Sequence, residues 1–365
     1  MRTRTLTANQ DKPIQTDMKI TTSLKIAGAV LASTLSVLAA RADLAINENV
    51  SLLGYAAGSV QYNKVPTQNT DTTADIDVAK IGVALNFEPI TANVSICTDT
   101  GAKDLYLLDA YVSYDFSHGL TASAGRFVTY LGYESFDLPE NTFITYGVAN
   151  IGGVANMFPS YHQGVKIEYA NGKTTLGLAL VDSVYNLRDG EDFYRGDGDV
   201  RDGFGIEGNF THAEEQWTLG LTLAYQYAKA GYQSIDGIDP YAADPETFTA
   251  DIWLERNIGD ITLAAEVAMK RENDKFSQAR NTYYVALMAK QDLSDKISLA
   301  GRLSYGNEKD FGNFWKLSVM PVGYEISNNF SIRSEVSYTR YGKSIRALGE
   351  PKYEFFAGVQ AVFKF

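Results

Sequence analysis

The chain has 365 residues, 45% of them apolar and 21% charged, with one Cys and nine Pro, so it is neither a disordered chain nor a disulfide scaffold. Its formal net charge of −12 argues against a nucleic-acid-binding protein, because such proteins need a basic face. No uninterrupted apolar run of about 18 residues follows residue 42, which excludes a helical membrane protein and leaves a soluble domain or a membrane β-barrel.

Residues 1–42 form a leader that carries a secretory signal peptide at residues 18–42. Two lysines precede an apolar stretch over residues 26–40, and the small-x-small sequence Ala40-Arg41-Ala42 follows. This pattern is typical of a cleaved signal and is too short for a membrane anchor. We therefore expect one mature domain over residues 43–365, in which Cys97 is a buried strand residue.

The mature segment is dominated by two-residue alternation of apolar and polar side chains, the periodicity of β-strands. Sixteen strands are predicted, near residues 50–62, 76–87, 90–98, 105–116, 119–127, 164–170, 174–184, 203–211, 216–228, 247–256, 260–270, 281–291, 296–306, 313–324, 329–340 and 352–365. The last of them alternates over 14 residues, which is long for a soluble sheet and fits a span of lipid.

The polar face of these strands distinguishes a membrane barrel from a soluble sandwich. In the strand at 216–228, Leu219, Leu221 and Leu223 share one face, whereas Gly220 and Thr222 lie on the other. A sandwich would bury the large apolar face against a second sheet. Here the small and polar face needs water inside a closed cylinder, so the apolar face must meet lipid.

The connections support the same interpretation, because short turns alternate with long, polar loops along the chain. This layout, with an even strand number, is typical of a 16-stranded antiparallel transmembrane β-barrel, an all-β fold of the bacterial outer membrane. Aromatic residues near the strand ends are expected to form two girdles at the membrane interfaces. The predicted girdle residues are Trp217, Tyr225, Tyr227, Tyr353, Phe363 and Phe365.

The segment from Gly125 to Asn141, GRFVTYLGYESFDLPEN, is similar to a stretch of the OmpL-like β-barrel porin family. The similarity rests on Gly125-Arg126-Phe127, on Leu131-Gly132-Tyr133-Glu134 and on Pro139 with Asn141. The signal peptide, the strand number and the terminal Phe also resemble bacterial outer-membrane porins. The resemblance implies passive diffusion through a water-filled lumen, and it implies that the C-terminal strand is read by the barrel assembly machinery.

The longest connection, residues 128–163, is the third long loop, and in porins the third loop folds into the lumen and narrows it. A structureless loop of about 36 residues is unusual without a function. The apolar stretch at residues 146–158 favours burial against the inner wall, although an extracellular lid is the alternative. The candidate constriction residues are Tyr133, Glu134, Asp137, Glu140 and Asn141.

Charged residues on the inward faces of the strands should line water, because a Lys or Arg facing lipid at mid-depth costs roughly 2–4 kcal/mol. Arg126 falls on the lipid face by strict alternation, and a bulge would turn it inward. Arg302 and Arg333 could face the acidic loop across the lumen and create a transverse field; ordinary wall charges without selectivity are the alternative. The predicted pore wall comprises Lys166, Glu168, Asp251, Glu255, Glu266, Lys270, Arg302, Arg333 and Glu335.

An enzyme is not expected, because the chain has three His and lacks a Gly-x-Ser-x-Gly elbow, a His-Glu-x-x-His motif and a phosphate loop. No metal or cofactor is expected either. The acidic loop at residues 186–203 could bind Ca²⁺ or bridge lipopolysaccharide through divalent cations, but its spacing does not match an EF-hand, and a solvated loop is the simpler interpretation.

These features predict an outer-membrane porin that passes small hydrophilic solutes and ions by passive diffusion. The alternative is a secreted or surface β-protein that acts as an adhesin or a carbohydrate-binding module. The expected partners are outer-membrane lipid, lipopolysaccharide, the barrel assembly machinery and small solutes, with no nucleic acid. A homotrimer is expected from general porins and not from particular residues.

Overall fold

The computed structural model describes residues 44–66, 70–99, 105–134, 137–147, 157–159, 161–185, 203–228, 246–273, 280–309, 312–347 and 351–365. The predicted signal peptide at 18–42 lies outside these residues. The same is true of residues 186–202 of the acidic loop and of most of the apolar stretch at 146–158.

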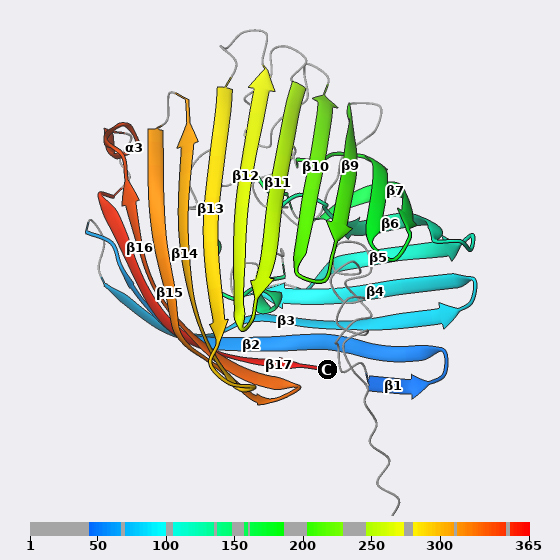
Figure 1. Ribbon diagram of the computed structural model, residues 1–365, viewed down its shortest axis with the longest axis horizontal. Helices are drawn as coiled ribbons and strands as arrows, with labels where there is room; N and C mark the ends of the chain where they lie inside the picture. Colours follow the sequence, from blue (N-terminus) through cyan, green and yellow to red (C-terminus); the bar gives the residue numbers. More distant parts are fainter. Residues whose placement is uncertain are drawn as a thin grey trace, which may run out of the picture.

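Sixteen long strands pair in chain order, each antiparallel to the next, and form a ring (Figure 1). Strand β17 closes the ring by pairing with β2, from Phe355 opposite Lys64 to Lys364 opposite Tyr55. The prediction of a sixteen-stranded antiparallel closed barrel is confirmed. The strands are β2 (Val50–Lys64), β3 (Asp71–Phe87), β4 (Ile90–Asp99), β5 (Tyr106–Asp115), β6 (Leu120–Val128), β7 (Tyr161–Ala170), β8 (Thr174–Val181), β9 (Gly203–Ala213), β10 (Trp217–Ala228), β11 (Glu246–Ile258), β12 (Ile261–Asn273), β13 (Arg280–Asp292), β14 (Ile297–Glu308), β15 (Gly312–Ser327), β16 (Phe330–Tyr341) and β17 (Tyr353–Lys364).

A further strand, β1 (Leu44–Asn47), was not predicted. It forms a hairpin with β2, in which Leu44 lies opposite Leu52. On the same edge of β2, Phe365 exchanges two backbone hydrogen bonds with Gly54, of 2.8 and 2.9 Å. Strand β1 therefore continues the edge of β2 at the point where the last strand of the barrel ends. Four residues are too few for an alternation pattern to predict.

The connection between β6 and β7 is shorter than expected. The sequence places it at residues 128–163, but Val128 pairs with Tyr161 and both belong to strands. The connection thus spans residues 129–160. Within it the structure describes a short 3-10 helix, η1 (Leu138–Glu140). The alternation pattern fails here because the side chains at the start of β7 are buried whichever way they point.

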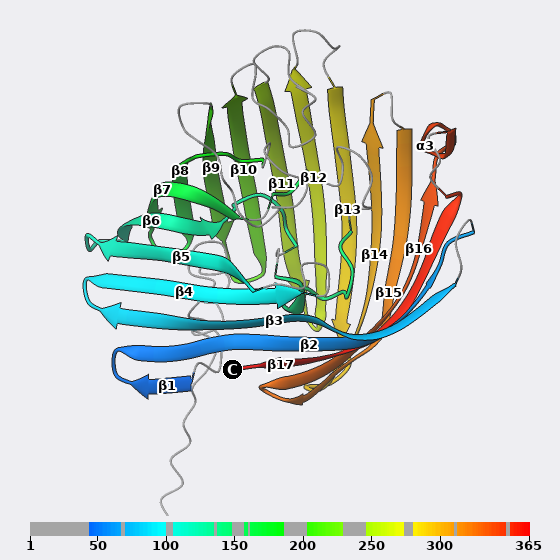
Figure 2. The same ribbon diagram turned by 180° about the vertical axis from the view of Figure 1, so that it is seen from behind.

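The two faces of the wall differ in the way that the sequence predicts. On β7, Val165 and Ile167 are more than half exposed, whereas Lys166 and Glu168 between them are each 8% exposed. On β12, Leu263 and Val267 are exposed and Glu266 is buried. The exposed apolar side chains form the outer surface of the ring, and the buried polar side chains form the inner surface. Figure 2 shows the ring of strands from behind. No helix in the described part of the chain is long and apolar enough to span a bilayer.

Strand β5 departs from simple alternation. The register of β4 and β5 shifts between Ser95 and Ile96, which is a β-bulge. As a result Leu107 is 46% exposed on the outer face and Leu108 is buried, with 1% of its surface exposed. Alternation from residue 110 backwards would place Leu108 outside, so that expectation is wrong for this residue.

Candidate functional site

Residues 129–134 and 137–147, here called the loop segment, leave β6 and make hydrogen bonds to side chains of the inner wall. The backbone N–H groups of Tyr130 and Gly132 donate to Glu207 on β9 and Asp251 on β11, at 3.1 and 2.9 Å. The N–H of Tyr133 donates to Glu266 on β12 at 2.7 Å. Hydrogen bonds to a charged acceptor are stronger than those between neutral groups, so these carboxylates fix the backbone of the first half of the loop segment.

The second half of the loop segment contacts β14, β15 and β16. Thr145 donates from its backbone N–H and its hydroxyl to Glu335, at 2.8 and 2.7 Å. Arg302 donates to the carbonyl of Thr145 at 2.8 Å, and Lys316 donates to the carbonyl of Tyr146 at 2.7 Å. Donors and acceptors of the loop backbone are thus both matched by ionisable side chains of the wall.

All five predicted constriction residues contact the wall. Glu134 forms an ion pair with Arg302 and also accepts the N–H of Gly147 at 2.7 Å. Asp137 pairs with Lys80 at 3.2 Å, and Glu140 pairs with Lys364 at 3.1 Å. The remaining contacts are the hydroxyl of Tyr133 to Glu255 at 2.7 Å and the carbonyl of Asn141, which accepts from Arg333.

The two arginines do not face the acidic loop across an open lumen, as the transverse field would require. Arg302 touches Glu134 directly and also lies 3.7 Å from Glu335, and its guanidinium carbon is 4.3 Å from the centre of the Phe143 ring. Arg333 bonds the loop backbone on one side and Gln360 on the other, at 2.8 Å. Both arginines are therefore in contact with the loop segment.

Other predicted wall residues form ion pairs with neighbours on the wall and make few contacts with the loop segment. Lys166 and Glu168 form an ion pair of 3.0 Å, and Glu168 accepts the hydroxyl of Tyr130 at 2.8 Å. Lys270 pairs with Glu272 at 3.1 Å and lies 5.0 Å from the Tyr185 ring centre. Lys270 thus belongs to a separate cluster near the end of β12.

Two tyrosines of the loop segment donate hydrogen bonds to wall carboxylates in surroundings that disfavour the ionised hydroxyl. Burial is the main cause that raises the pKa of the Tyr133 hydroxyl, and the adjacent Glu255 carboxylate raises it further. The pKa of Tyr130 is raised in the same way by burial and then by Glu168. Each hydroxyl donates a hydrogen bond to a wall carboxylate, and its surroundings disfavour ionisation more strongly than in a free tyrosine.

Several inner-wall residues that take part in these contacts were not predicted, among them Lys80, Glu207 and Lys316. Trp253, whose ring centre lies 5.4 Å from that of Tyr133, was not predicted either. All four share the inward alternation of their strands, so the signal was present in the sequence. Trp253 is the least expected, because an aromatic ring was expected on the lipid face. In the register Trp253 lies opposite Gly220 on the neighbouring strand β10, and the glycine has no side chain, which leaves room for the ring.

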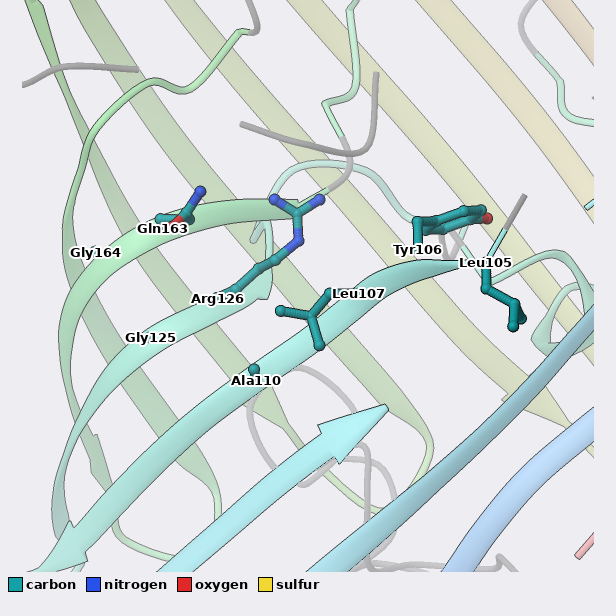
Figure 3. Close-up of a pocket in the computed structure, with 8 residues that line it drawn as sticks. All are labelled: Leu105, Tyr106, Leu107, Ala110, Gly125, Arg126, Gln163 and Gly164. Carbon is teal, nitrogen blue, oxygen red and sulfur yellow. The ribbon is translucent and has the colours of Figure 1, made fainter. Parts of the chain in front are cut away.

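Arg126 occupies a gap between β5 and β6, and neither of the two expected positions describes it fully. It lies opposite Ala110 and Gln163 in the register, at the last residue pair of β5 and β6. Its Nε donates to the carbonyl of Leu108 at 2.9 Å, and only 5% of its surface is exposed. Arg126 lines a pocket of about 590 Å³ formed by residues of β5, β6 and β7 and by Leu105. Figure 3 shows the lining residues, Leu105, Tyr106, Leu107, Ala110, Gly125, Arg126, Gln163 and Gly164.

The residue before it helps to shape this gap. Gly125 has a φ of 132°, which residues with a side chain rarely adopt, and a Cβ at this position would lie 2.2 Å from the carbonyl oxygen of Ala110. A glycine is therefore required where β5 and β6 separate. The Arg126 guanidinium lies 5.7 Å from the ring centre of Tyr161, so the separated strand end packs against β7.

The predicted girdle residues lie on the exposed apolar face near the ends of their strands. Trp217 begins β10 and its ring centre is 5.3 Å from that of His212. At the other end of β10, Tyr225 and Tyr227 are within 6.4 and 6.1 Å of Phe204. On β17, Tyr353 stacks on Tyr338 at 5.7 Å, and Phe363 lies 5.9 Å from Phe365.

Residues 52–365 match the family model described as "Putative beta-barrel porin-2, OmpL-like". No curated protein sequence matches the chain. Among solved structures, an anion-selective porin from Comamonas acidovorans superposes with a TM-score of 0.65 at 12% identity, covering 87% of this chain and 99% of that one. The trimer form of OmpT from Vibrio cholerae gives 0.63 at 13%, with coverages of 87% and 100%. OmpF of Salmonella typhi, in complex with daunomycin, gives 0.63 at 14%, with coverages of 88% and 100%.

Proposed function

This chain belongs to the OmpL-like family of β-barrel porins, and from that premise we propose that the loop segment, residues 129–134 and 137–147, narrows its channel. As a member of this family the protein is an outer-membrane, porin-like channel for passive diffusion, and not an enzyme. Solutes cross down their own gradient, and the wall supplies only shape and charge. The closed ring is suited to this role because it has no unpaired strand edge in the lipid.

The observation that carries the proposal is the set of wall carboxylates that accept hydrogen bonds from the loop backbone. Glu207, Asp251 and Glu266 accept from the first half of the loop segment, and Glu335 accepts from the second half. All four have inward alternation and are at most 4% exposed. An extracellular lid would not need acceptors on four strands of the wall, β9, β11, β12 and β16, so these contacts favour a segment held inside the barrel.

Liposome swelling tests the narrowing. Vesicles that contain the purified protein are diluted into isotonic sugars of increasing size, and the rate of swelling is followed by light scattering. The variant that lacks residues 134–145 should admit larger sugars than the wild type does. An identical size limit for the two proteins would show that the loop segment does not narrow the channel.

The partners follow from the same surfaces. We propose that the exposed apolar face contacts outer-membrane lipid and lipopolysaccharide, and that β17 with the terminal Phe365 is recognised by the barrel assembly machinery. A homotrimer is proposed because a similar solved structure is described as a trimer form. The transported solutes would be small and hydrophilic.

A further inference from the structure

Trp253 stands apart from the other tryptophans of the chain because it faces inward. Trp217 and Trp315 lie on the outer face, whereas Trp253 follows Asp251 and precedes Glu255 on the inner face of β11. Its indole lies directly over Gly220 on β10. A Cβ on that glycine would lie 2.2 Å from Cε2 of the indole, so the glycine allows the ring to rest against the wall.

Tyr133 of the loop segment completes an aromatic pair with this indole. The two ring centres are 5.4 Å apart, and the planes are inclined by 58°. The Tyr133 hydroxyl is held by Glu255 at 2.7 Å, which fixes the orientation of the phenol ring. All three side chains remain partly exposed, whereas Asp251 and Glu266 beside them are 1% and 4% exposed.

The charge around this pair is negative. Asp251, Glu255 and Glu266 lie on the inner faces of adjacent strands β11 and β12, and Trp253 pairs in register with Glu266. The nearby cation Arg302 is already ion-paired with Glu134 and lies 3.7 Å from Glu335. Glu255 has no ion pair in the described part of the chain. An aromatic pair beside such a carboxylate can bind an organic cation, since the ring face attracts positive charge and the apolar part of the cation packs on the rings.

We propose that Trp253, Tyr133 and Glu255 form a subsite for small organic ammonium cations that pass through the channel. This inference rests on the proposed function, because it requires the loop segment to lie in the lumen. A neutral sugar could also stack on the rings and donate hydrogen bonds to the carboxylates, but it carries no positive charge for them to attract, so the negative charge favours the ammonium cation. The subsite slows such a cation in transit and should reduce the ionic current while the cation is bound.

Choline is a suitable probe, and the current carried by KCl through single channels in planar bilayers is the readout. Choline chloride added at constant KCl should reduce the current of the wild type in a saturable manner. Trp253→Ala should raise the half-blocking concentration about tenfold, which corresponds to about 1.4 kcal/mol and is in the range of a desolvated cation–π contact. Trp253→Phe should show a smaller change, and Glu255→Gln should also weaken the block.

Trp315→Ala is the matched control, because it removes an indole that is 38% exposed on the outer face. It should leave the block by choline unchanged. Equal half-blocking concentrations in the wild type, Trp253→Ala and Glu255→Gln would overturn the inference, and so would a block by glucose that replaces the block by choline. Either result, with KCl conductance intact, would count against the cation subsite alone. A folded barrel that conducts no KCl would instead contradict the proposed channel function.

Discussion

Arg302 is the residue whose loss should release the loop segment most clearly. It pairs with Glu134, donates to the carbonyl of Thr145 at 2.8 Å and lies against the Phe143 ring, and it is 2% exposed. Arg302→Met keeps a flexible, unbranched side chain but removes the guanidinium. The carboxylates of Glu134 and Glu335 then lose the positive charge of the guanidinium, although both keep their hydrogen bonds from the loop segment. Removal of one member of a buried ion pair costs about 3–5 kcal/mol.

That cost falls on the docked arrangement of the loop segment, because the barrel strands keep their backbone hydrogen bonds. A loss of about 3–5 kcal/mol changes the ratio of docked to released segment by roughly 10²- to 4 × 10³-fold. We expect Arg302→Met to show a higher single-channel conductance in planar bilayers, or frequent steps between two levels. Its reversal potential in a KCl gradient should shift toward cation preference, since a positive charge leaves the lumen.

Arg340→Met is the matched control, because Arg340 is exposed on the outer face, in register between Trp315 and Tyr353. It carries the same change of charge and should conduct as the wild type does. Migration in detergent gels before and after heating establishes that both variants fold. If folded Arg302→Met and Arg340→Met have the same conductance and reversal potential, the loop segment is not held by Arg302 at the narrow part of the channel.

Four further outcomes are expected. Deletion of residues 134–145 should raise single-channel conductance, and an unchanged value would remove the loop segment from the pore. Arg333→Gln should shift the reversal potential toward cation preference, and no shift would place Arg333 away from the ion path. Gly220→Ala should lower the temperature at which the barrel unfolds in a gel-shift assay, because the new methyl group would lie within 2.6 Å of the indole and the overpacking costs about 1–3 kcal/mol of stability. An unchanged temperature would mean that the ring moves aside freely. A hydrogen bond from Lys173 lowers the pKa of Glu214 in the β9–β10 turn, so the ion pair stabilises the fold above the unfolded pKa of about 4.3, and this stabilisation is lost as the pH falls through the lower folded pKa. Glu214→Gln should therefore lower the unfolding temperature at pH 7 and not at pH 2. The same difference at both pH values would be incompatible with the ion pair as its source.

The barrel could be predicted from the sequence because its strands carry a local signal. Alternation depends only on neighbouring residues, and an inward Lys166 between outward Val165 and Ile167 can be recognised without knowing the partner strand. The short turns pair strands in every second connection, and their alternation with long loops, together with an even strand number, is typical of a closed ring. The inner and outer faces of the barrel were accordingly assigned correctly along most of the chain.

The contacts of the loop segment could not be predicted in the same way. The hydrogen bond from Tyr133 to Glu266 joins residues that are 133 positions apart, and nothing local indicates which carboxylate a loop N–H will meet. The bulge at Leu108 shifts a register by one residue, and no turn residue marks it. Trp253 was overlooked because aromatic residues were expected on lipid, although its position between Asp251 and Glu255 indicated the inner face.

Single-channel recording of the purified wild-type protein in planar bilayers tests the central account most directly. A water-filled barrel should produce discrete current steps in KCl, and the size of the steps should rise in proportion to salt concentration without any energy source. Protein that migrates as a folded, heat-modifiable barrel and inserts into the bilayer, yet carries no KCl current at any concentration, would contradict the account.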